Sequence, residues 1–409
     1  MLSRGPNAGR AIGARSSAPP PCHADDAFGT RVNTPIETRA AARIPTHSVG
    51  TGAPLTVEIF ALSDVGRTRE HNEDAFVVAD LADGTPIDLT DAVRQPVGHH
   101  GLLFMVADGM GGAAAGELAS ATAVDVVLRY LREQWTPRRD GAPSDFVETL
   151  EKATDVANGA IFRYASEHPE LRGMGTTATI AGLLGDTLYL AQVGDSRAYL
   201  VRGGVARQIT KDQSLMQKLI EAGEISEEDA EHNERRNIIL QALGPEAAIK
   251  IDLTHQQVRR GDVLLLCSDG LSGLVRAEEF GRAVSEEPDL PHVCERLIMM
   301  ANAMGGPDNI TVVAARFDGE RLGPPNVADH IGHQVYDVPG RQPSETGTVD
   351  DMMRARTEQM EAMFESAPAE IPAAARVERA EKGLVVKGVL ATAAVVLGGY
   401  LIWRLIQVL

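Results

Sequence analysis

The sequence predicts an α+β fold in which antiparallel sheets carry helices on their outer faces. Strand-like apolar runs and helical patterns arrive in blocks along the chain, which is typical of such folds and not of alternating βαβ units. Four strand-like runs follow one another between residues 176 and 210, separated by turn residues, as in an antiparallel meander. With 409 residues, of which 44% are hydrophobic, the chain can bury one large core.

The first half of the predicted domain contains strands, then helices, then the meander. Runs rich in Val, Ile, Leu and Phe predict strands at 55–62, 75–80 and 102–108. Apolar residues at helical spacing predict long helices at 116–134 and 144–166. The meander consists of the runs TTATIAGLL, DTLYLAQV, SRAYLVR and VARQIT.

A polar helical segment at 214–237 interrupts the strands of the second half, and we expect it to form a surface flap. Ser226, followed by three acidic residues, indicates a helix start within it. Further strands are predicted at 238–240, 250–258 and 262–269, helices at about 277–285 and 290–303, and a last strand at 309–317.

The composition divides the chain into four parts. Residues 1–54 contain scattered Arg among Pro, Gly, Ala and Ser, and we predict a disordered extension. A transit peptide is the alternative, but Asp25, Asp26 and the prolines at 19–21 disfavour an amphipathic helix. Residues 55–317 form the predicted globular domain. Residues 318–383 read as a linker that includes a short Met-rich helical pattern at 350–366, and residues 384–409 follow.

The segment 384–409 predicts a single-pass membrane anchor at the C-terminal end. Residues 384–402 are apolar apart from Lys387, and about 20 such residues span a hydrocarbon core. Tyr400 and Trp403 suit the interface, and basic residues upstream place the preceding domain on the cytoplasmic side. A buried core helix or a docking helix for another protein is the alternative reading.

Charge and cysteine content exclude other classes. The formal net charge of −18 argues against a nucleic-acid partner, because phosphate backbones are held by clustered Lys and Arg. Cys22, Cys267 and Cys294 form neither a CxxC pair nor a disulfide framework, which indicates a reducing compartment. The sequence carries no signal for an oligomeric state.

Four acidic motifs lie beside strand-like runs and predict a metal site. They contain Asp108 in VADGMGG, Glu73 and Asp74 in TREHNEDAF, Asp269 in LLLCSDGLSGL, and Asp308 in GGPDNITVV. Carboxylates gathered in one cleft repel one another, and hard cations such as Mg²⁺ or Mn²⁺ remove that cost. Two ions held in this way can activate water for phosphoryl transfer, and Arg69, four residues before Glu73, can hold a phosphate.

Seven motifs in order resemble those of the metal-dependent serine/threonine protein phosphatases of type 2C, in their bacterial form. They span about residues 57–317 and read GRTREHNEDAF, VADGMGG, GTTATIAG, VGDSRAYL, QITKDQS, CSDGL and GGPDNITVV. The resemblance implies a four-layer sandwich of two antiparallel β-sheets flanked by helices. It also implies that the flap at 214–237 borders the substrate groove.

The resemblance also implies roles for eight residues. Asp108 would bridge two Mn²⁺ or Mg²⁺ ions, the Gly109 carbonyl would bind one of them, and Asp269 and Asp308 would bind the other. Glu73 and Asp74 would hold metal-bound waters, and Arg69 would hold the substrate phosphate. Asp195 would help to bind a third, weaker ion.

Two positions depart from the pattern of the relatives. Met110 stands where eukaryotic relatives carry a histidine proposed as the general acid, and methionine cannot donate a proton. Gln213 stands where many relatives have a histidine, with a modest effect expected on the flap or the third ion. His71 is expected to be an exposed turn residue, and Cys267 a packed thiol.

The sequence thus predicts a membrane-tethered phosphatase that hydrolyses phosphoserine and phosphothreonine by attack of a metal-bridging hydroxide. Its substrates would be phosphoproteins made by Ser/Thr kinases. The alternative is a catalytically silent regulator with the same fold, which would usually have lost Asp108, Asp269 or Asp308. A purely structural membrane protein would leave the acidic motifs unexplained.

Overall fold

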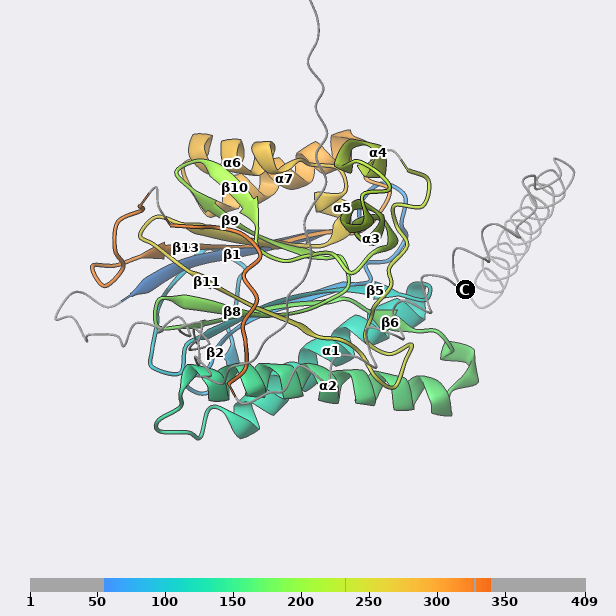
Figure 1. The fold of residues 1–409 in the computed structure, drawn as a ribbon, viewed down its shortest axis with the longest axis horizontal. Helices are drawn as coiled ribbons and strands as arrows, with labels where there is room; N and C mark the ends of the chain where they lie inside the picture. The colour runs from blue at the N-terminus through green and yellow to red at the C-terminus, as the bar shows by residue number, and fades with distance from the viewer. Residues whose placement is uncertain (1–54, 232, 327–328, 340–409) are drawn as a thin grey trace, which may run out of the picture. The chain divides into compact units, whose positions relative to one another are not determined.

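Two antiparallel β-sheets stack face to face in the protein, and helices cover both outer faces (Figure 1). The computed structural model describes residues 55–231, 233–326 and 329–339. The predicted α+β architecture with helices outside is confirmed. The predicted N-terminal extension 1–54, the helical pattern at 350–366 and the apolar segment 384–409 lie outside the described residues. Within the described ranges, no helix has the length and apolarity needed to cross a bilayer.

The upper sheet in Figure 1 has six strands and joins the two ends of the domain. Its order is β10 (Val205–Gln208), β9 (Arg197–Arg202), β12 (Val263–Cys267), β13 (Ile310–Asp318), β1 (Thr56–Asp64) and β4 (Val93–Pro96). The first strand pairs with the last along its full length, from Thr56 opposite Asp318 to Asp64 opposite Ile310. The short strand β4 was not predicted, because its sequence VRQP has no apolar pattern.

The lower sheet has seven strands and is built around β5 (Leu102–Met110). The others are β11 (Asp252–Gln257), β8 (Thr187–Val193), β7 (Ala178–Leu184), β2 (Asp74–Asp80) and β3 (Thr85–Pro86), with β6 (Gly175–Thr176) paired to the end of β5. The four runs predicted as a meander are all strands, but they form two antiparallel hairpins, β7–β8 and β9–β10, in different sheets. A single meander is therefore wrong, and β8 pairs on its other side with β11.

Helices occupy the outer layers. α1 (Ala113–Gln134) and α2 (Pro143–Glu167) cover the lower sheet, and α6 (Ala277–Glu286) and α7 (Leu290–Ala303) cover the upper one (Figure 1). A side-chain cap starts α7, where Asp289 accepts a hydrogen bond from the His292 amide at 3.0 Å. The short helices are a 3₁₀ turn (Pro169–Leu171) and α5 (Asp269–Ser272).

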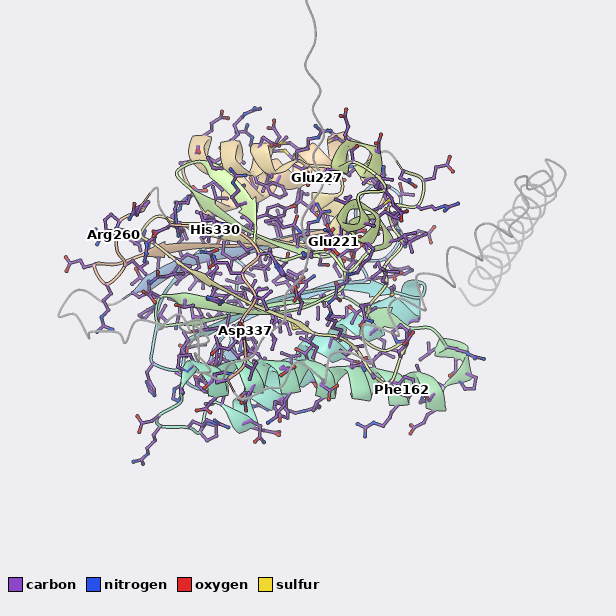
Figure 2. All side chains as sticks on the ribbon, viewed as in Figure 1. Phe162, Glu221, Glu227, Arg260, His330 and Asp337 are labelled. Carbon is purple, nitrogen blue, oxygen red and sulfur yellow. The ribbon has the colours of Figure 1, made fainter. Side chains whose placement is uncertain are left out.

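The flap contains two short helices, as the polar helical pattern at 214–237 predicted. They are α3 (Leu215–Ala222) and α4 (Glu227–Glu231), and Figure 2 labels Glu221 and Glu227 on them. Leu215 and Leu240 belong to a small apolar cluster of the flap itself. The strand predicted at 238–240 is wrong, because only one isolated bridge forms there, between Ser214 and Ile239.

Strand β5 serves two cores because successive side chains point to opposite faces of a sheet. Leu103 and Met105 pack under α1 and α2, whereas Leu102, Phe104 and Val106 pack between the two sheets. All five side chains are fully buried. The continuous apolar run that marked this strand in the sequence therefore reflects burial on both faces.

The packed chain continues beyond Phe317, where the sequence placed the start of a linker. Residues 329–338, here called the strap, run along the edge strand β11. The amide of Tyr336 donates to the Leu253 carbonyl at 2.8 Å, and the amide of His255 donates to the Gln334 carbonyl at 2.9 Å. Figure 2 labels His330 and Asp337 on the strap. Backbone hydrogen bonds and one buried aromatic residue hold the strap on β11. Neither leaves a strand pattern in its polar sequence.

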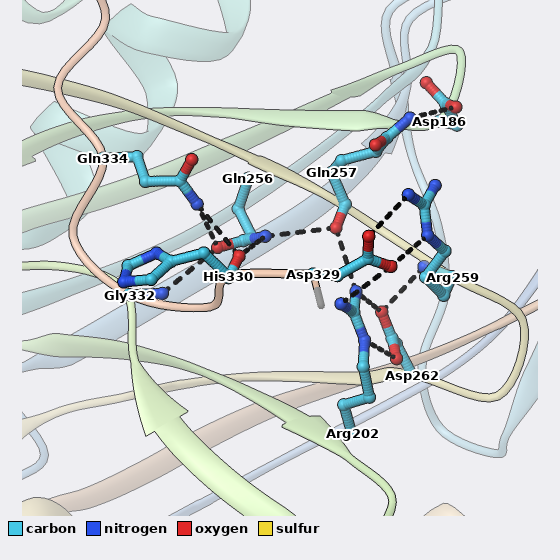
Figure 3. Close-up of polar contacts among 10 residues, drawn as sticks. All are labelled: Asp186, Arg202, Gln256, Gln257, Arg259, Asp262, Asp329, His330, Gly332 and Gln334. Atoms are coloured by element: carbon cyan, nitrogen blue, oxygen red, sulfur yellow. Dashed lines mark hydrogen bonds and ion pairs between the residues drawn. The ribbon is translucent and has the colours of Figure 1, made fainter. Parts of the chain in front are cut away.

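A charged network holds the start of the strap (Figure 3). Asp329 accepts a hydrogen bond from Arg259 at 2.7 Å and lies 3.6 Å from Arg202. Arg202 in turn forms a two-armed contact with the fully buried Asp262, at 2.9 and 2.6 Å. Asp329 therefore supplies a second anion to a site that otherwise has two guanidinium groups and one carboxylate.

Candidate active site

Both sheets deliver acidic residues to one end of the sandwich, beside the flap. Asp108 lies on β5 and pairs directly with Asp74 on the neighbouring strand β2. Asp269 begins α5, immediately after β12, and Asp308 precedes β13 by two residues. Because β2 and β5 belong to the lower sheet and β12 and β13 to the upper one, the stacking of the sheets creates the cluster.

The carboxylates of this cluster shift one another electrostatically. Burial raises the pKa of Asp108 well above its ordinary value, and the negative charges of Asp74 and Asp269 raise it further. Burial and the charge of Asp308 likewise raise the pKa of Asp269, although a hydrogen bond with Asp108 opposes the shift. The site is therefore short of positive charge, and a bound cation would relieve it.

Asp74 is held by two hydroxyl groups. Its Oδ2 accepts hydrogen bonds from Thr311 at 2.6 Å and from Ser268 at 2.8 Å. Burial raises the pKa of Asp74 to about 7, and the two hydroxyl groups oppose this shift. Its Oδ1 is buried without a hydrogen-bond partner. An unpartnered carboxylate oxygen beside other carboxylates can bind a cation or accept a hydrogen bond from a cation-bound water.

Glu73 and Gly109 lie where β5 and α1 approach most closely. Glu73 is 6% exposed, and burial raises the pKa of its carboxyl group. A Cβ on Gly109 would lie 2.3 Å from the Gly116 carbonyl oxygen, and one on Gly116 would lie 2.0 Å from Glu73 Oε2. Glycine at both positions therefore allows the Glu73 carboxyl group to lie beside the backbone of Gly109 and Gly116.

Arg69 joins the cluster from the loop before β2. Its Nη2 donates to Asp308 Oδ2 at 2.8 Å, and the side chain is 45% exposed. The guanidinium group therefore borders the carboxylates while remaining accessible to solvent. This placement suits a group that receives a phosphate, because a guanidinium group can donate to two phosphate oxygens at once.

Asp195 lies in the turn between β8 and β9, and burial raises the pKa of its carboxyl group well above the ordinary value. Its Oδ1 is buried without a partner. Gln213 holds this turn in place. Its backbone N–H donates to the Gly194 carbonyl at 2.9 Å, and its side-chain Oε1 accepts from the Gly194 backbone N–H at 3.0 Å. Gln213 Nε2 also donates to the Lys250 carbonyl at 3.1 Å, so this residue ties the turn to the chain that follows the flap.

A groove of about 670 Å³ opens between the acidic cluster and the flap. Arg69, Asp269 and Asp308 line one part of it. Met216 and Ile220 of α3 line another part. The flap therefore borders the groove at the candidate site, as the resemblance implied.

The donor set fits hard divalent cations. It consists of carboxylates and backbone carbonyls, which are the ligands that Mg²⁺ and Mn²⁺ prefer. In the described part of the chain, no three acidic, histidine or cysteine side chains already converge as a preformed cage. In this arrangement Asp308 is engaged by Arg69, at 2.8 Å. Ion binding would therefore replace this contact.

Three supporting residues were not singled out from the sequence. Asn309 accepts a hydrogen bond from the Glu73 amide at 2.8 Å and donates to the carbonyls of Val65 and His71, at 3.0 and 2.9 Å. Ser268 and Thr311 hold Asp74, as described above. Ser, Thr and Asn are common around strands, so the one usable signal was that Ser268 directly precedes Asp269 and Asn309 directly follows Asp308, whereas Thr311 had none.

Other candidates do not act as nucleophiles or ligands here. Cys267 is fully buried in β12, and burial raises the pKa of its thiol to about 12, so it stays protonated. His71 is exposed, as expected, and contributes its backbone carbonyl to Asn309. Met110 ends β5 and has no group that could transfer a proton.

Comparison with known proteins identifies relatives. A family model described as Protein phosphatase 2C matches residues 80–305. The chain is 38% identical over 257 residues to the serine/threonine phosphatase Stp of Listeria monocytogenes, covering 63% of this chain and 94% of that protein. It is 37% identical over 262 residues to the serine/threonine protein phosphatase PstP of Mycobacterium tuberculosis, covering 64% of this chain and 45% of that one.

A solved structure shares the fold. The catalytic domain of a serine/threonine protein phosphatase PstP, in complex with two manganese ions, superposes with a TM-score of 0.53 at 35% identity. The match covers 64% of this chain and 99% of that domain. The similarity therefore extends over nearly the whole of that domain.

Proposed function

The chain belongs to the bacterial protein phosphatase 2C family and is a serine/threonine protein phosphatase, and from this premise we propose how its acidic cluster works. The proposed reaction is hydrolysis of phosphoserine and phosphothreonine in proteins, in which water adds to phosphorus and the bond to the side-chain oxygen breaks. The observation that carries the proposal is the position of Asp108, which pairs with Asp74 at the end of the lower sheet and lies close enough to Asp269 of the upper sheet for both charges to raise its pKa.

Asp108, Asp269, Asp308 and the Gly109 carbonyl are the groups that would hold two Mn²⁺ or Mg²⁺ ions. When bound, such ions would neutralise the carboxylates, stabilise the phosphoryl oxygens and lower the pKa of the attacking water. The PstP domain with two manganese ions supports this assignment. Asp195, with its unpartnered oxygen, is proposed to contribute to a third, weaker site.

The remaining residues orient the reactants. Arg69 is proposed to bind the substrate phosphate, for which its guanidinium group would leave Asp308 or be shared with it. Glu73 and Asp74 are proposed to accept hydrogen bonds from water molecules at the centre, and the hydroxyls of Ser268 and Thr311 hold Asp74 in place for this task. No side chain of the cluster needs to form a covalent intermediate, and the protonated thiol of Cys267 could not do so.

An assay with a phosphothreonine peptide and Mn²⁺ tests the role of the cluster. We expect Asp108→Asn to lower turnover by about 100-fold or more, because several kcal/mol of charge stabilisation is lost. Asp125→Asn, on the exposed face of α1, is the matched control and should keep full turnover. The silent-regulator alternative predicts no phosphate release by the wild type or by Asp108→Asn. That result, or equal phosphate release by these two proteins, would refute the proposed chemistry.

Thermal unfolding separates lost chemistry from lost fold in the same variant. Asp108→Asn removes one of several repelling buried carboxylates, so the metal-free variant should unfold at a temperature no lower than that of the wild type. A large drop in its unfolding temperature would show that the loss of turnover reflects misfolding.

We further propose that the domain is tethered to a membrane on its cytoplasmic side by residues 384–409. The support is the run of apolar residues at 384–402, with Tyr400 and Trp403 at its end and basic residues before it. Phosphoproteins made by Ser/Thr kinases near that membrane would then be its substrates. In cell fractions, carbonate-resistant membrane retention should disappear when residues 384–409 are deleted, and unchanged retention would refute the tether.

A further inference from the structure

The groove at the candidate active site has an exposed apolar residue that the proposed chemistry does not use. Met304 caps the end of α7 and is 59% exposed, although it lines the same groove as Arg69 and Asp308. Single exposed apolar residues are common on protein surfaces, and Met304 is informative because it lies in the groove of the candidate active site.

Apolar residues from three other segments line the groove with Met304. Met216 and Ile220 come from α3 of the flap, Leu274 follows α5, and Pro307 precedes Asp308. We call Met216, Ile220, Leu274, Met304 and Pro307 the apolar rim. Because the flap contributes one part and the ends of α5 and α7 the other, a segment bound in the groove could contact both.

The arginine side chains of the groove already contact other residues. Arg197 forms a two-armed contact with Asp212, with distances of 2.7 to 3.0 Å, and Arg69 contacts Asp308. The groove also contains Glu227, which opposes any preference for acidic substrates, and its other arginines already have interaction partners. Within the apolar rim, Met216 is buried and Ile220 and Leu274 are half-buried, whereas Met304 and Pro307 are exposed and can contact a substrate side chain.

We propose that the apolar rim selects phosphoprotein segments with an apolar side chain next to the phosphorylated residue, with Met304 as a specificity-determining residue. The inference rests on the proposed function, because it takes the phosphate to lie at Arg69. Residues of an extended peptide are about 3.3 Å apart along the chain, so a residue one or two positions away stays within the same groove. Its burial against the rim would strengthen binding of the whole segment.

Pairs of phosphothreonine peptides that differ at one flanking position, leucine or glycine, test this inference with the full-length chain. With Mn²⁺ present, we expect the leucine peptide to show a kcat/KM about 10-fold higher, mainly through a lower KM, because one aliphatic side chain is buried. Met304→Glu should bring this ratio close to one, and Met304→Leu should retain it.

Met299→Glu is the matched control. Met299 is 63% exposed on the same helix but does not line the groove, so the ratio should stay as in the wild type. Taking the ratio of two peptides within each variant removes any general effect on folding or metal content. An equal loss in both glutamate variants, a ratio of one in the wild type, or a wild-type preference for the glycine peptide would overturn the inference.

Two further measurements separate this inference from the proposed function. Failure of the wild type to hydrolyse p-nitrophenyl phosphate, which has no flanking residue, would contradict the proposed function alone. Fluorescence anisotropy of the labelled peptides then still tests the rim without turnover. Tighter binding of the leucine peptide, lost in Met304→Glu, supports the rim, and equal binding of both peptides overturns it.

Discussion

Asp74 shows how a single residue in this site depends on its surroundings. Its carboxylate is buried and accepts two hydrogen bonds from hydroxyl groups, yet its pKa still rises to about 7 because burial outweighs both bonds. The folded, metal-free protein therefore keeps a proton on Asp74 that the unfolded chain has already released, since an unfolded aspartate ionises near pH 4. The stability from this proton is fully present below pH 4 and is lost as the pH rises through 7.

Asp74→Asn should remove this pH dependence. In urea unfolding with a chelator present, we expect the free energy of unfolding of the wild type to fall by about 1 kcal/mol more than that of the variant between pH 6 and pH 8. Asparagine keeps an oxygen that can accept from Ser268 and Thr311, so the fold should be retained. Parallel pH profiles for the two proteins would contradict the assignment.

Residue by residue, the sequence identified the acidic groups but not their supports. Asp108, Asp269 and Asp308 stand out because each follows or precedes an apolar run and has glycine or a turn beside it. Asn309, by contrast, acts through three backbone groups at Glu73, Val65 and His71, and such contacts leave no pattern in a single sequence. The modest effect expected of Gln213 stays a prediction, and its hydrogen bonds to the backbone of Gln192, Gly194 and Lys250 show which segments this residue connects.

At the scale of elements, the close crossing of β5 and α1 fixes the candidate site. Gly116 in α1 leaves no room for a Cβ, because that atom would lie 2.0 Å from Glu73 Oε2 and 2.9 Å from the Gly109 backbone. The sequence marked the glycine-rich turn after β5 as a place of close approach, and the structure agrees. It did not show which helix residue would meet the turn, because that depends on how the helix packs.

Gly116→Ala and Gly159→Ala therefore form a matched pair. Both glycines lie inside long helices, but nothing lies within 4 Å of a Cβ built on Gly159. We expect Gly159→Ala to raise the free energy of unfolding by about 0.5–1 kcal/mol through helix propensity. Gly116→Ala should lower it by about 2 kcal/mol through overpacking, and should lower turnover as well, because Glu73 must move.

Chemical denaturation and the phosphopeptide assay check both expectations. A Gly116→Ala protein with wild-type stability and turnover would mean that the crossing of β5 and α1 is looser than described.

The strap is the element that the sequence missed. Tyr336 is 6% exposed and makes edge-to-face contacts with Tyr189 and His255, with ring centres 5.5 and 5.7 Å apart. One buried aromatic residue in a polar stretch has no periodicity, so no pattern could predict that this stretch packs on β11. The strap also lies outside the residues matched by the family model.

Tyr336→Ala should lower the free energy of unfolding by about 3 kcal/mol, because a buried ring is replaced by a cavity. Tyr336→Phe keeps the ring and should stay within about 0.5 kcal/mol of the wild type. Turnover per folded molecule should be unchanged in both, because the strap does not line the groove. A selective loss of turnover in Tyr336→Ala would show instead that the strap influences the site.

At the scale of the whole molecule, both sheets contribute acidic residues to the candidate site. The sequence indicated antiparallel sheets and external helices from the order of its blocks, and the motif series implied the stacked arrangement. The division of the four predicted runs between two sheets could not be read locally, because each run carries only its own strand pattern and no signal for its partner. Which strands pair depends on contacts between residues far apart in the chain.

Ions bound at the cluster should therefore stabilise the whole sandwich. At a Mn²⁺ concentration 100 times its dissociation constant, we expect about 2.7 kcal/mol of added stability, seen as a higher unfolding temperature. Asp108→Asn should abolish most of this shift, whereas Asp125→Asn should leave it intact. A shift of equal size in both variants would place the ions elsewhere.

The pairing of β1 with β13 has a consequence during synthesis. Strand β1 can pair with β4 early, but it can pair with β13 only after about 250 more residues have been translated, and Asp308 emerges just before β13. A nascent chain on the ribosome is thus inactive until Asp308 and β13 have been synthesised. Prematurely terminated products would be equally harmless to the cell's phosphoproteins, because a half-translated domain has no active centre to misuse.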